Sequence, residues 1–142
     1  MAMESAKAVM PMIAVDSVDD IDQFYTDKLG FTRVMGVAGD DGRLNTVTLI
    51  LGGARIRFTR ASGEMDGTQP FSGKRPVEIY LEVADVDAYH AQLKERGVKF
   101  SDPLTLQWWG DKTFKVTDPY GYETWFYQTV GEPKPPEGAK IV

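Results

Sequence analysis

The side chains that most often carry enzyme chemistry are scarce in this sequence. Its 142 residues include no cysteine and one histidine, His90. Without cysteine there is no thiol nucleophile, zinc–thiolate site or iron–sulfur cluster. One histidine cannot build a multi-histidine metal site or a pair of histidine acid/base groups within one chain. The composition therefore excludes these kinds of site.

The charge balance and the N-terminal segment narrow the class of protein further. Sixteen Lys and Arg against 21 Asp and Glu give a net charge of −5, whereas nucleic-acid surfaces normally carry a basic stripe. The first apolar run is interrupted by Pro11 and is too short for a signal peptide or a membrane span. We therefore expect a cytoplasmic protein that binds neither nucleic acid nor membrane.

The elements that must position any site are predicted twice in the same order: strand, helix, then three strands. In the first half a strand at 8–15 leads into a helix that ends at Gly30, with strands at 31–37, 44–51 and 54–59. In the second half a strand at 77–83 precedes a helix that ends at Gly97. The strand candidates that follow are 98–100, 105–109, 112–117 and 123–129. Ile13 matches Leu81, and Phe58 matches Phe126, at one constant offset.

This repeat predicts an α+β fold of two βαβββ modules, at 8–61 and 77–130. Residues 62–76 are expected to form a linker, and the Pro-rich residues 131–142 an extended tail. Each curved sheet would pack one face on its helix and turn the other toward a shared cavity. His90 falls in the second helix, outside such a cavity. We therefore interpret it as a helix-surface or helix-packing residue rather than a general base.

Three segments then resemble a known family. They are the two strand–helix openings, IAVDSVDDIDQFYTDKLGF and LEVADVDAYHAQLKERGVKF, and the segment WWGDKTFKVTDPYGYETWFYQ. In this order they are similar to the vicinal-oxygen-chelate superfamily, which includes glyoxalase I, bleomycin-resistance proteins and extradiol dioxygenases. The resemblance covers residues 10–128. It implies paired modules around a cavity and a homodimer, with exchange of modules between chains as one possible arrangement.

Metal-dependent members of that superfamily carry a His, Glu or Gln ligand on the first and last strand of each module. The resemblance places these positions at Met10, Arg57, Glu78 and Trp125. Only Glu78 is a competent ligand, because Met is soft, Arg is a permanent cation and indole offers no lone pair. We therefore predict no metal and no other cofactor.

From these positions, side-chain alternation predicts which residues face the cavity. Arg57 and Glu78 are expected to pair across it, and one of the two tryptophans at 108 and 109 to face inward. Aromatic rings and thioethers together make an adaptable pocket for a flat or cationic molecule. The ligand-binding candidates are Met10, Met12, Arg55, Arg57, Glu78, Tyr80, Trp108, Trp109, Trp125 and Tyr127.

We predict a protein of the glyoxalase/bleomycin-resistance type that binds a small aromatic or cationic molecule without metal, as in sequestration of an antibiotic or toxin. The alternative is a lyase or isomerase of the glyoxalase I type, metal-dependent or with Glu78 as general base and Tyr80 or Tyr127 as proton donor. A third reading is a sensing or partner-binding domain without turnover.

Overall fold

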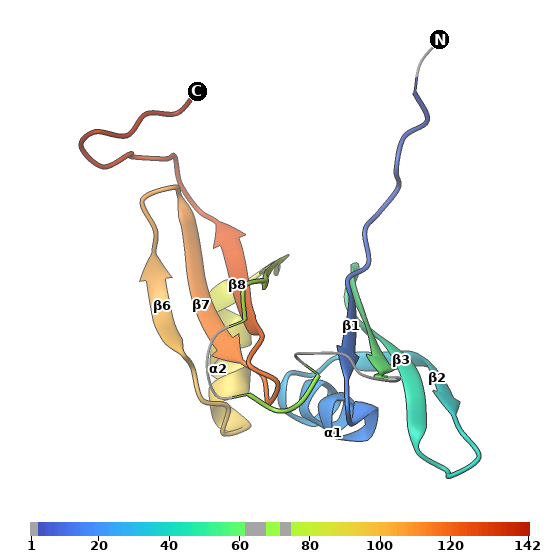
Figure 1. Ribbon diagram of the computed structural model, residues 1–142. Helices are drawn as coiled ribbons and strands as arrows, with labels where there is room; N and C mark the ends of the chain where they lie inside the picture. The colour runs from blue at the N-terminus through green and yellow to red at the C-terminus, as the bar shows by residue number, and fades with distance from the viewer. Residues whose placement is uncertain (1–2, 62–67, 72–74) are drawn as a thin grey trace. The chain divides into compact units, whose positions relative to one another are not determined.

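The computed structural model describes residues 3–61, 68–71 and 75–142. The chain divides into two compact units, Met1–Pro70 and Phe71–Val142, each described here by itself (Figure 1). In the described part of each unit, four strands form one mixed sheet that packs against a helix. The predicted α+β fold is confirmed. Of the predicted linker, residues 62–67 and 72–74 lie outside the described residues.

Unit 1 contains a sheet in the order β1-β4-β3-β2. Strand β1 runs parallel to β4, and the other neighbours are antiparallel. The helix continues past its last α-helical residue as a short π-helical segment, η1. The elements are β1 Met12–Val15, α1 Val18–Gln23, η1 Phe24–Lys28, β2 Thr32–Ala38, β3 Leu44–Leu51 and β4 Ala54–Arg60.

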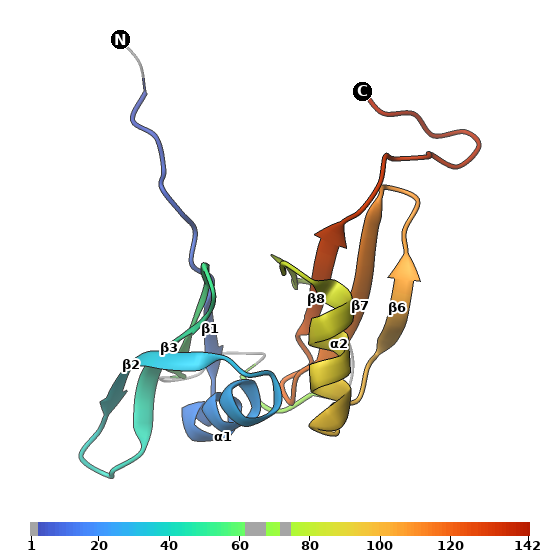
Figure 2. The ribbon, with the colours of Figure 1, turned by 180° about the vertical axis from the view of Figure 1, so that it is seen from behind.

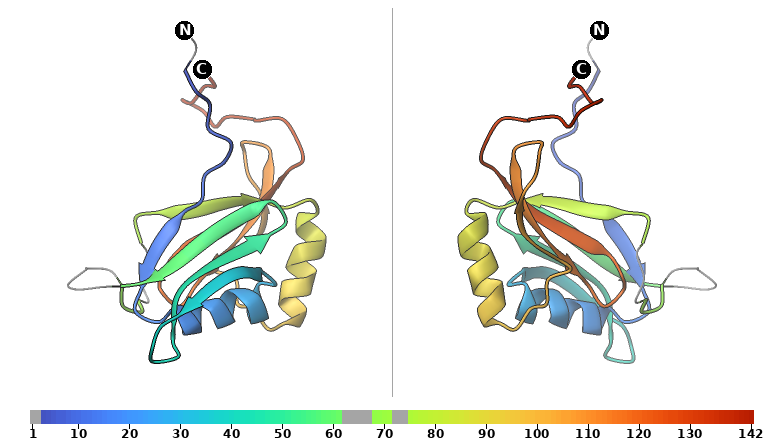
Figure 3. Two further views of the ribbon diagram at one scale, coloured as in Figure 1. Left: turned by 90° about the vertical axis from the view of Figure 1, so that its right-hand side faces the viewer. Right: turned by 90° about the vertical axis from the view of Figure 1, so that its left-hand side faces the viewer.

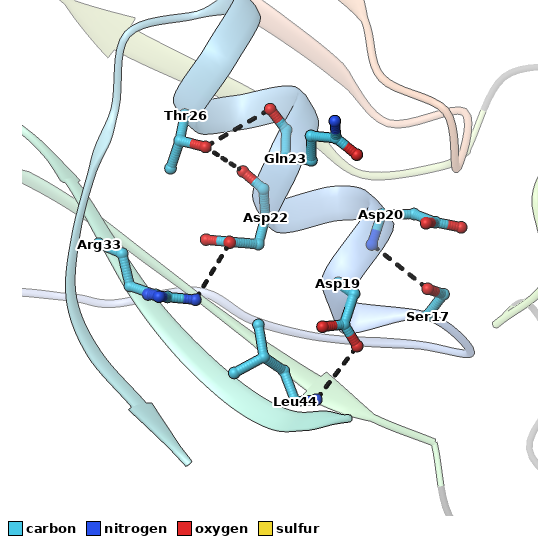
Figure 4. A network of polar contacts seen from close by, with 8 residues as sticks. All are labelled: Ser17, Asp19, Asp20, Asp22, Gln23, Thr26, Arg33 and Leu44. Atoms are coloured by element: carbon cyan, nitrogen blue, oxygen red, sulfur yellow. Dashed lines mark hydrogen bonds and ion pairs between the residues drawn. The ribbon is translucent and has the colours of Figure 1, made fainter. Parts of the chain in front are cut away.

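Polar contacts fix helix α1 at its start (Figure 4). The Ser17 hydroxyl caps the helix by accepting a hydrogen bond from the Asp20 backbone N–H at 3.3 Å. Asp19 accepts one from the Leu44 N–H at 3.1 Å, which ties the helix to the first residue of β3. Arg33 on β2 forms an ion pair with Asp22 at 3.3 Å. Ser17 therefore caps α1, and the acidic residues Asp19 and Asp22 attach it to the sheet.

Unit 2 repeats this arrangement with the strand order β5-β8-β7-β6. Asp85 caps its helix by accepting from the Ala88 N–H at 3.0 Å. The helix ends before Gly97, which adopts a φ of 74°. The elements are β5 Glu78–Glu82, α2 Val86–Glu95, β6 Asp102–Leu106, β7 Asp111–Thr117 and β8 Glu123–Thr129.

Each helix packs on one face of its own sheet. Figure 3 shows α1 along the unit 1 sheet, where it contacts β3 and β4. Figure 2 shows α2 across β7 and β8. Side-chain alternation places the residues between the cavity-facing candidates on the helix side of each sheet. Of these, Ile13, Val15, Ile56, Phe58 and Leu81 are buried, and Ile79 and Val83 are half-buried. Alternation along these strands therefore identified the core faces.

His90 belongs to the packing between α2 and the sheet. Its ring stacks on Phe100 with centroids 4.2 Å apart and meets Phe114 edge-on at 5.1 Å. Burial is the largest effect that lowers the pKa of His90, and nearby Lys94 lowers it further. The interpretation of His90 as a helix-packing residue agrees with these contacts.

Three predicted strands differ from the observed ones. Residues 98–100 form no strand, because Val98 caps α2 by donating to the Leu93 carbonyl at 3.1 Å. The strand expected at 105–109 lies at Asp102–Leu106 and includes Pro103, which an edge strand tolerates. The first strand begins at Met12 rather than at residue 8.

Within the described ranges, no helix combines the length and apolar character that a membrane span requires.

Candidate functional site

The unit 2 sheet has a second face, which points away from α2 and is called the far face below. Directly paired residues on neighbouring strands point to the same side of a sheet. Trp125 on β8 pairs with Tyr80 on β5 and with Lys115 on β7, so all three share the far face. Its charged and aromatic members on the strands are Glu78, Tyr80, Glu82, Asp102, Asp111, Lys115, Glu123, Trp125 and Tyr127.

Aromatic rings form a continuous group on the far face. Tyr80 and Tyr127 stack with centroids 4.3 Å apart, and Tyr80 lies 5.7 Å from Trp125. Trp109, from the turn between β6 and β7, lies 6.2 Å from Trp125. Trp108 meets Trp109 edge-on at 5.5 Å and is 44% exposed. The structure thus brings all five aromatic candidates of unit 2 together.

A chain of hydrogen bonds fixes this group. The Trp109 indole N–H donates to the Tyr80 hydroxyl at 2.8 Å, and that hydroxyl donates to Asp111 at 2.6 Å. Thr129 donates to the other Asp111 oxygen at 2.7 Å. Burial and the Asp111 bond raise the pKa of Tyr80 to about 12. Tyr80 therefore keeps its proton at neutral pH, and that proton is already bonded to Asp111.

Lys115 is the charged centre of the far face and is itself only 9% exposed. Its ammonium lies 3.3 Å from Asp102, 3.8 Å from Glu123 and 3.9 Å from Glu78. It also lies 4.0 Å from the centre of the Trp125 ring. Glu78, the predicted base, is thus partly neutralised within its own unit.

The turn that carries the tryptophans is held by the chain segment after β8, which passes beside it (Figure 1). Val130 and Gly131 donate backbone hydrogen bonds to the Gly110 carbonyl at 2.9 and 3.1 Å. Lys134 donates to the Trp108 carbonyl at 2.6 Å. The start of the predicted extended tail is therefore attached to the site.

Unit 1 carries the remaining candidates on its face away from α1. Met12, Arg57 and Thr48 lie side by side in the sheet, and Arg57 donates to the Thr48 hydroxyl at 3.2 Å. Arg55 shares this face two residues earlier on β4. Met10 precedes β1 and is half-buried. The predicted Arg57–Glu78 pair joins residues of different units and stays a prediction.

The residues of unit 2 do not fit the metal site of the metal-dependent relatives. The two positions that the resemblance gives to ligands hold Glu78 and Trp125, and the Lys115 ammonium lies within 4.0 Å of both. An ammonium repels a divalent cation at this distance, and indole cannot coordinate one. Among the described residues, no cluster of three or more His, Asp or Glu side chains is arranged to hold a metal.

Reasoning from sequence missed Asp111, Lys115 and Glu123. The D-P-Y-G turn at 118–121 joins β7 and β8, and pairing outward from it would have placed Lys115 beside Trp125. That signal was present. The contact of Lys115 with Asp102 depends on the register shift in β6, for which the sequence offers no marker.

Known proteins resemble this chain over most of its length. An uncharacterized protein of Mycobacterium bovis is 29% identical over 136 residues, which cover 93% of this chain and 90% of that protein. The bleomycin resistance protein of Staphylococcus aureus is 28% identical over 134 residues, with 85% and 96% covered. The crystal structure of TioX from Micromonospora sp. ML1 superposes with a TM-score of 0.70 at 20% identity, covering 88% of this chain and all of that one.

The family itself is established by a sequence profile. The profile of the Glyoxalase/Bleomycin resistance protein/Dioxygenase superfamily matches residues 7–126, which include every strand and helix of both units except the end of β8. This is the family that the three sequence segments resemble, and the similar structure supports the same fold. The chain therefore belongs to the glyoxalase/bleomycin resistance protein/dioxygenase superfamily.

Proposed function

We propose that this protein binds a small aromatic or cationic molecule without a metal or other cofactor and holds it without turnover. The observation that carries the proposal is the aromatic group of the far face, in which Tyr80, Trp125 and Tyr127 lie beside one another. Tyr80 is 44% exposed although its hydroxyl is fixed. Ordered aromatic rings with accessible surface bind flat or cationic ligands at low entropic cost.

Charge favours a cationic ligand over an anionic one. The described strand residues of the far face include a single ammonium group, that of Lys115. The same residues include five carboxylates, those of Glu78, Glu82, Asp102, Asp111 and Glu123. The net negative potential of such a surface attracts cations and repels anions. The similar protein of Staphylococcus aureus is named bleomycin resistance protein, after resistance to an antibiotic. We therefore propose antibiotic sequestration as the form of this function.

The surroundings of Glu78 favour binding over acid/base catalysis. Its carboxylate lies 3.9 Å from the Lys115 ammonium, which competes with any substrate proton for the same oxygen. The Tyr80 proton is likewise engaged by Asp111. The lyase or isomerase alternative therefore gains no support from these contacts.

The proposal extends to the unit 1 candidates and to assembly. Met10, Met12, Arg55 and Arg57 are proposed to contribute apolar surface and polar selectivity to ligand binding. We further propose a homodimer in the cytoplasm, as the resemblance implies. Light scattering coupled to gel filtration tests the dimer, and a monomer at micromolar concentration would contradict it.

Calorimetric titration tests the ligand class with bleomycin, the flat cation ethidium and the flat anion anilinonaphthalene sulfonate. We expect both cations to bind with a Kd on the order of micromolar and the anion to bind at least about 10-fold more weakly. Tyr127→Leu removes an aromatic ring but keeps apolar volume. It should weaken the binding of both cations about 10-fold. Phe71→Leu, at an exposed ring 4.5 Å from Arg75, is the matched control. Equal binding of the anion, or no cation binding, would contradict the proposal.

A further inference from the structure

The face of the unit 1 sheet that points away from α1 carries two arginines, and it is called the arginine face below. Strand pairing places Arg55 and Arg57 of β4 on this face, beside Met12, Thr48 and Ile50 of the neighbouring strands. No carboxylate lies among the described strand residues of the arginine face. Two positive charges without a negative one produce a local positive potential, which attracts anions.

Other arginines of unit 1 have carboxylate partners. Arg33 forms an ion pair with Asp22 at 3.3 Å, and Arg60 forms one with Asp41 at 2.9 Å. Among the described residues, no carboxylate forms an ion pair with either arginine of the arginine face. The two guanidinium groups therefore remain available to an anion from solution.

Arg57 is held in one orientation by Thr48. Its Nε donates to the Thr48 hydroxyl at 3.2 Å, and Thr48 is only 6% exposed. A guanidinium has five N–H donors, and this bond uses one of them. Arg57 is half-buried, so water screens its charge less than that of a fully exposed arginine. The free side of this guanidinium is thus an oriented pair of donors, which matches the two oxygens of a carboxylate or phosphate.

Arg55 adds a second charge beside this donor pair. It lies two residues before Arg57 on the same strand, so the two Cα atoms are about 7 Å apart. Arg55 is exposed, and its long side chain can turn toward an anion held by Arg57. Met12, directly beside Arg57 in the sheet, is 63% exposed and offers apolar surface. This combination suits an oxyanion that is part of an organic molecule.

We infer that the arginine face binds an oxyanion group, a carboxylate or a phosphate, of a small organic molecule. Arg57 provides the oriented donors, and Arg55 provides the second positive charge. The inference names the group that unit 1 selects, and it rests on the proposed function for the role of these arginines in ligand binding. It involves unit 1 alone, so a free anion measures it separately from cation binding at the far face.

NMR titration of the wild-type protein tests this inference. The Nε–H signals of Arg57 and Arg60 are followed in 15N-labelled protein at about pH 6.5 while sodium propionate or sodium phosphate is added. We expect the Arg57 signal to shift to saturation with a Kd of about 1–10 mM for at least one anion. Binding of this strength is far weaker than the cation binding proposed above. Sodium chloride at equal ionic strength is the control for screening.

The Arg60 signal reports the effect of anions on a guanidinium that is already paired. Arg60 belongs to the same strand but bonds to Asp41, so its signal should shift little. Saturation by propionate alone identifies a carboxylate site, and saturation by phosphate alone identifies a phosphate site. Equal shifts of both arginines, or the same shift in chloride, would overturn the inference. Cation binding without any anion response would overturn it while the proposed function stands.

Three variants separate an oriented site from a general effect of charge, with binding followed through the backbone amide signals of β4. Arg57→Gln and Arg60→Gln remove the same charge from the same strand. Arg57→Gln should weaken anion binding about 10-fold and Arg60→Gln less than about 2-fold. Thr48→Val keeps both arginines but releases the guanidinium of Arg57, and it should weaken binding about 3-fold. Equal losses in the two glutamine variants would overturn the inference. The wild-type titration decides it where a variant does not fold.

Glu78 is the competing partner, because the sequence predicts that it pairs with Arg57. Within unit 2 its carboxylate lies 3.9 Å from the Lys115 ammonium. We expect Glu78→Gln to bind the anion with the same Kd as the wild-type protein. An anion response that appears in Glu78→Gln and is absent from the wild-type protein would show that Glu78 occupies Arg57. That result would overturn the inference.

Discussion

The Tyr80 hydroxyl donates a hydrogen bond of 2.6 Å to Asp111 across an intervening strand. Tyr80 belongs to β5 and Asp111 to β7, and β8 lies between these strands in the sheet. The other Asp111 oxygen accepts from Thr129 of β8. One carboxylate thus links three strands, and the orientation of the Tyr80 ring depends on the assembled sheet rather than on its own strand.

The first prediction concerns Asp111→Asn. The bond to the carboxylate is one of the causes that raise the pKa of Tyr80 to about 12. Loss of the negative charge removes that cause and makes the tyrosinate easier to form. We therefore expect the pKa of Tyr80 to fall in this variant. Tyrosine-labelled 13C NMR, with Tyr80→Phe to assign the signal, measures it. An unchanged Tyr80 titration would show that the Asp111 bond is absent in solution.

The second prediction concerns Trp109→Phe, for which we expect the pKa of Tyr80 to rise rather than fall. The Trp109 indole donates to the Tyr80 oxygen, and this bond lowers the pKa of Tyr80 because it stabilises the tyrosinate. The phenyl ring fills much of the same space and has no donor. The same NMR titration should therefore show a higher pKa for Tyr80 than in the wild-type protein. A change in the same direction as in Asp111→Asn would contradict the proposed direction of the hydrogen-bond chain.

The third prediction concerns Gly110→Ala. Gly110 has a φ of 96°, and an added Cβ would overlap the Gly131 carbonyl. We expect a loss of unfolding free energy of about 2–4 kcal/mol, measured by urea denaturation. Gly42→Ala is the control, because Gly42 also has a positive φ, of 79°, but open space around its Cβ position. Gly42→Ala should cost only about 1–2 kcal/mol. Equal losses would show that Gly131 does not approach Gly110.

The fourth prediction concerns the pH dependence of stability through His90. Burial, followed by the charge of Lys94, lowers its pKa below 6.5 in the folded state, while Asp87 raises it. The folded state therefore favours the neutral ring. The neutral His90 ring therefore contributes to the stability of the folded protein above pH 6.5. This contribution is lost as the pH falls through the folded-state pKa of His90. His90→Phe keeps the stacking on Phe100 and should lose stability less steeply than the wild-type protein on acidification. Urea midpoints across this range measure the difference, and parallel curves would contradict it.

The sequence predicted the two sheets because each core strand alternates apolar residues with a period of two, as at Ile56 and Phe58. Gly97 similarly marked the end of α2. Tyr80, Trp125 and Tyr127 followed from alternation along β5 and β8, counted from the positions that the family resemblance gives. These signals are local, so one sequence was enough to recognise them.

Contacts set by register and by side-chain reach could not be predicted in the same way. The place of Trp109 depends on a turn that begins after Leu106, whereas the pattern suggested a strand through both tryptophans. The partners of Lys115 come from three separate strands, one of them irregular in its pairing. Alternation gives the face of a lysine, but the destination of its four-carbon stem depends on the assembled neighbours.

The attachment of the tail to the Trp108–Gly110 turn divides the last residues of the chain into two parts. The backbone bonds end with Lys134, and the bond from Ala139 to the Pro136 carbonyl that follows is internal to the tail. A carboxypeptidase should therefore trim this chain readily as far as the residues just after Lys134 and slow sharply there. Shortening to Lys134 should leave the Trp109–Tyr80 bond intact, and shortening to Thr129 should release the indole. Residues 130–134 therefore hold the turn that carries both tryptophans, and they belong to the site rather than to the extended tail.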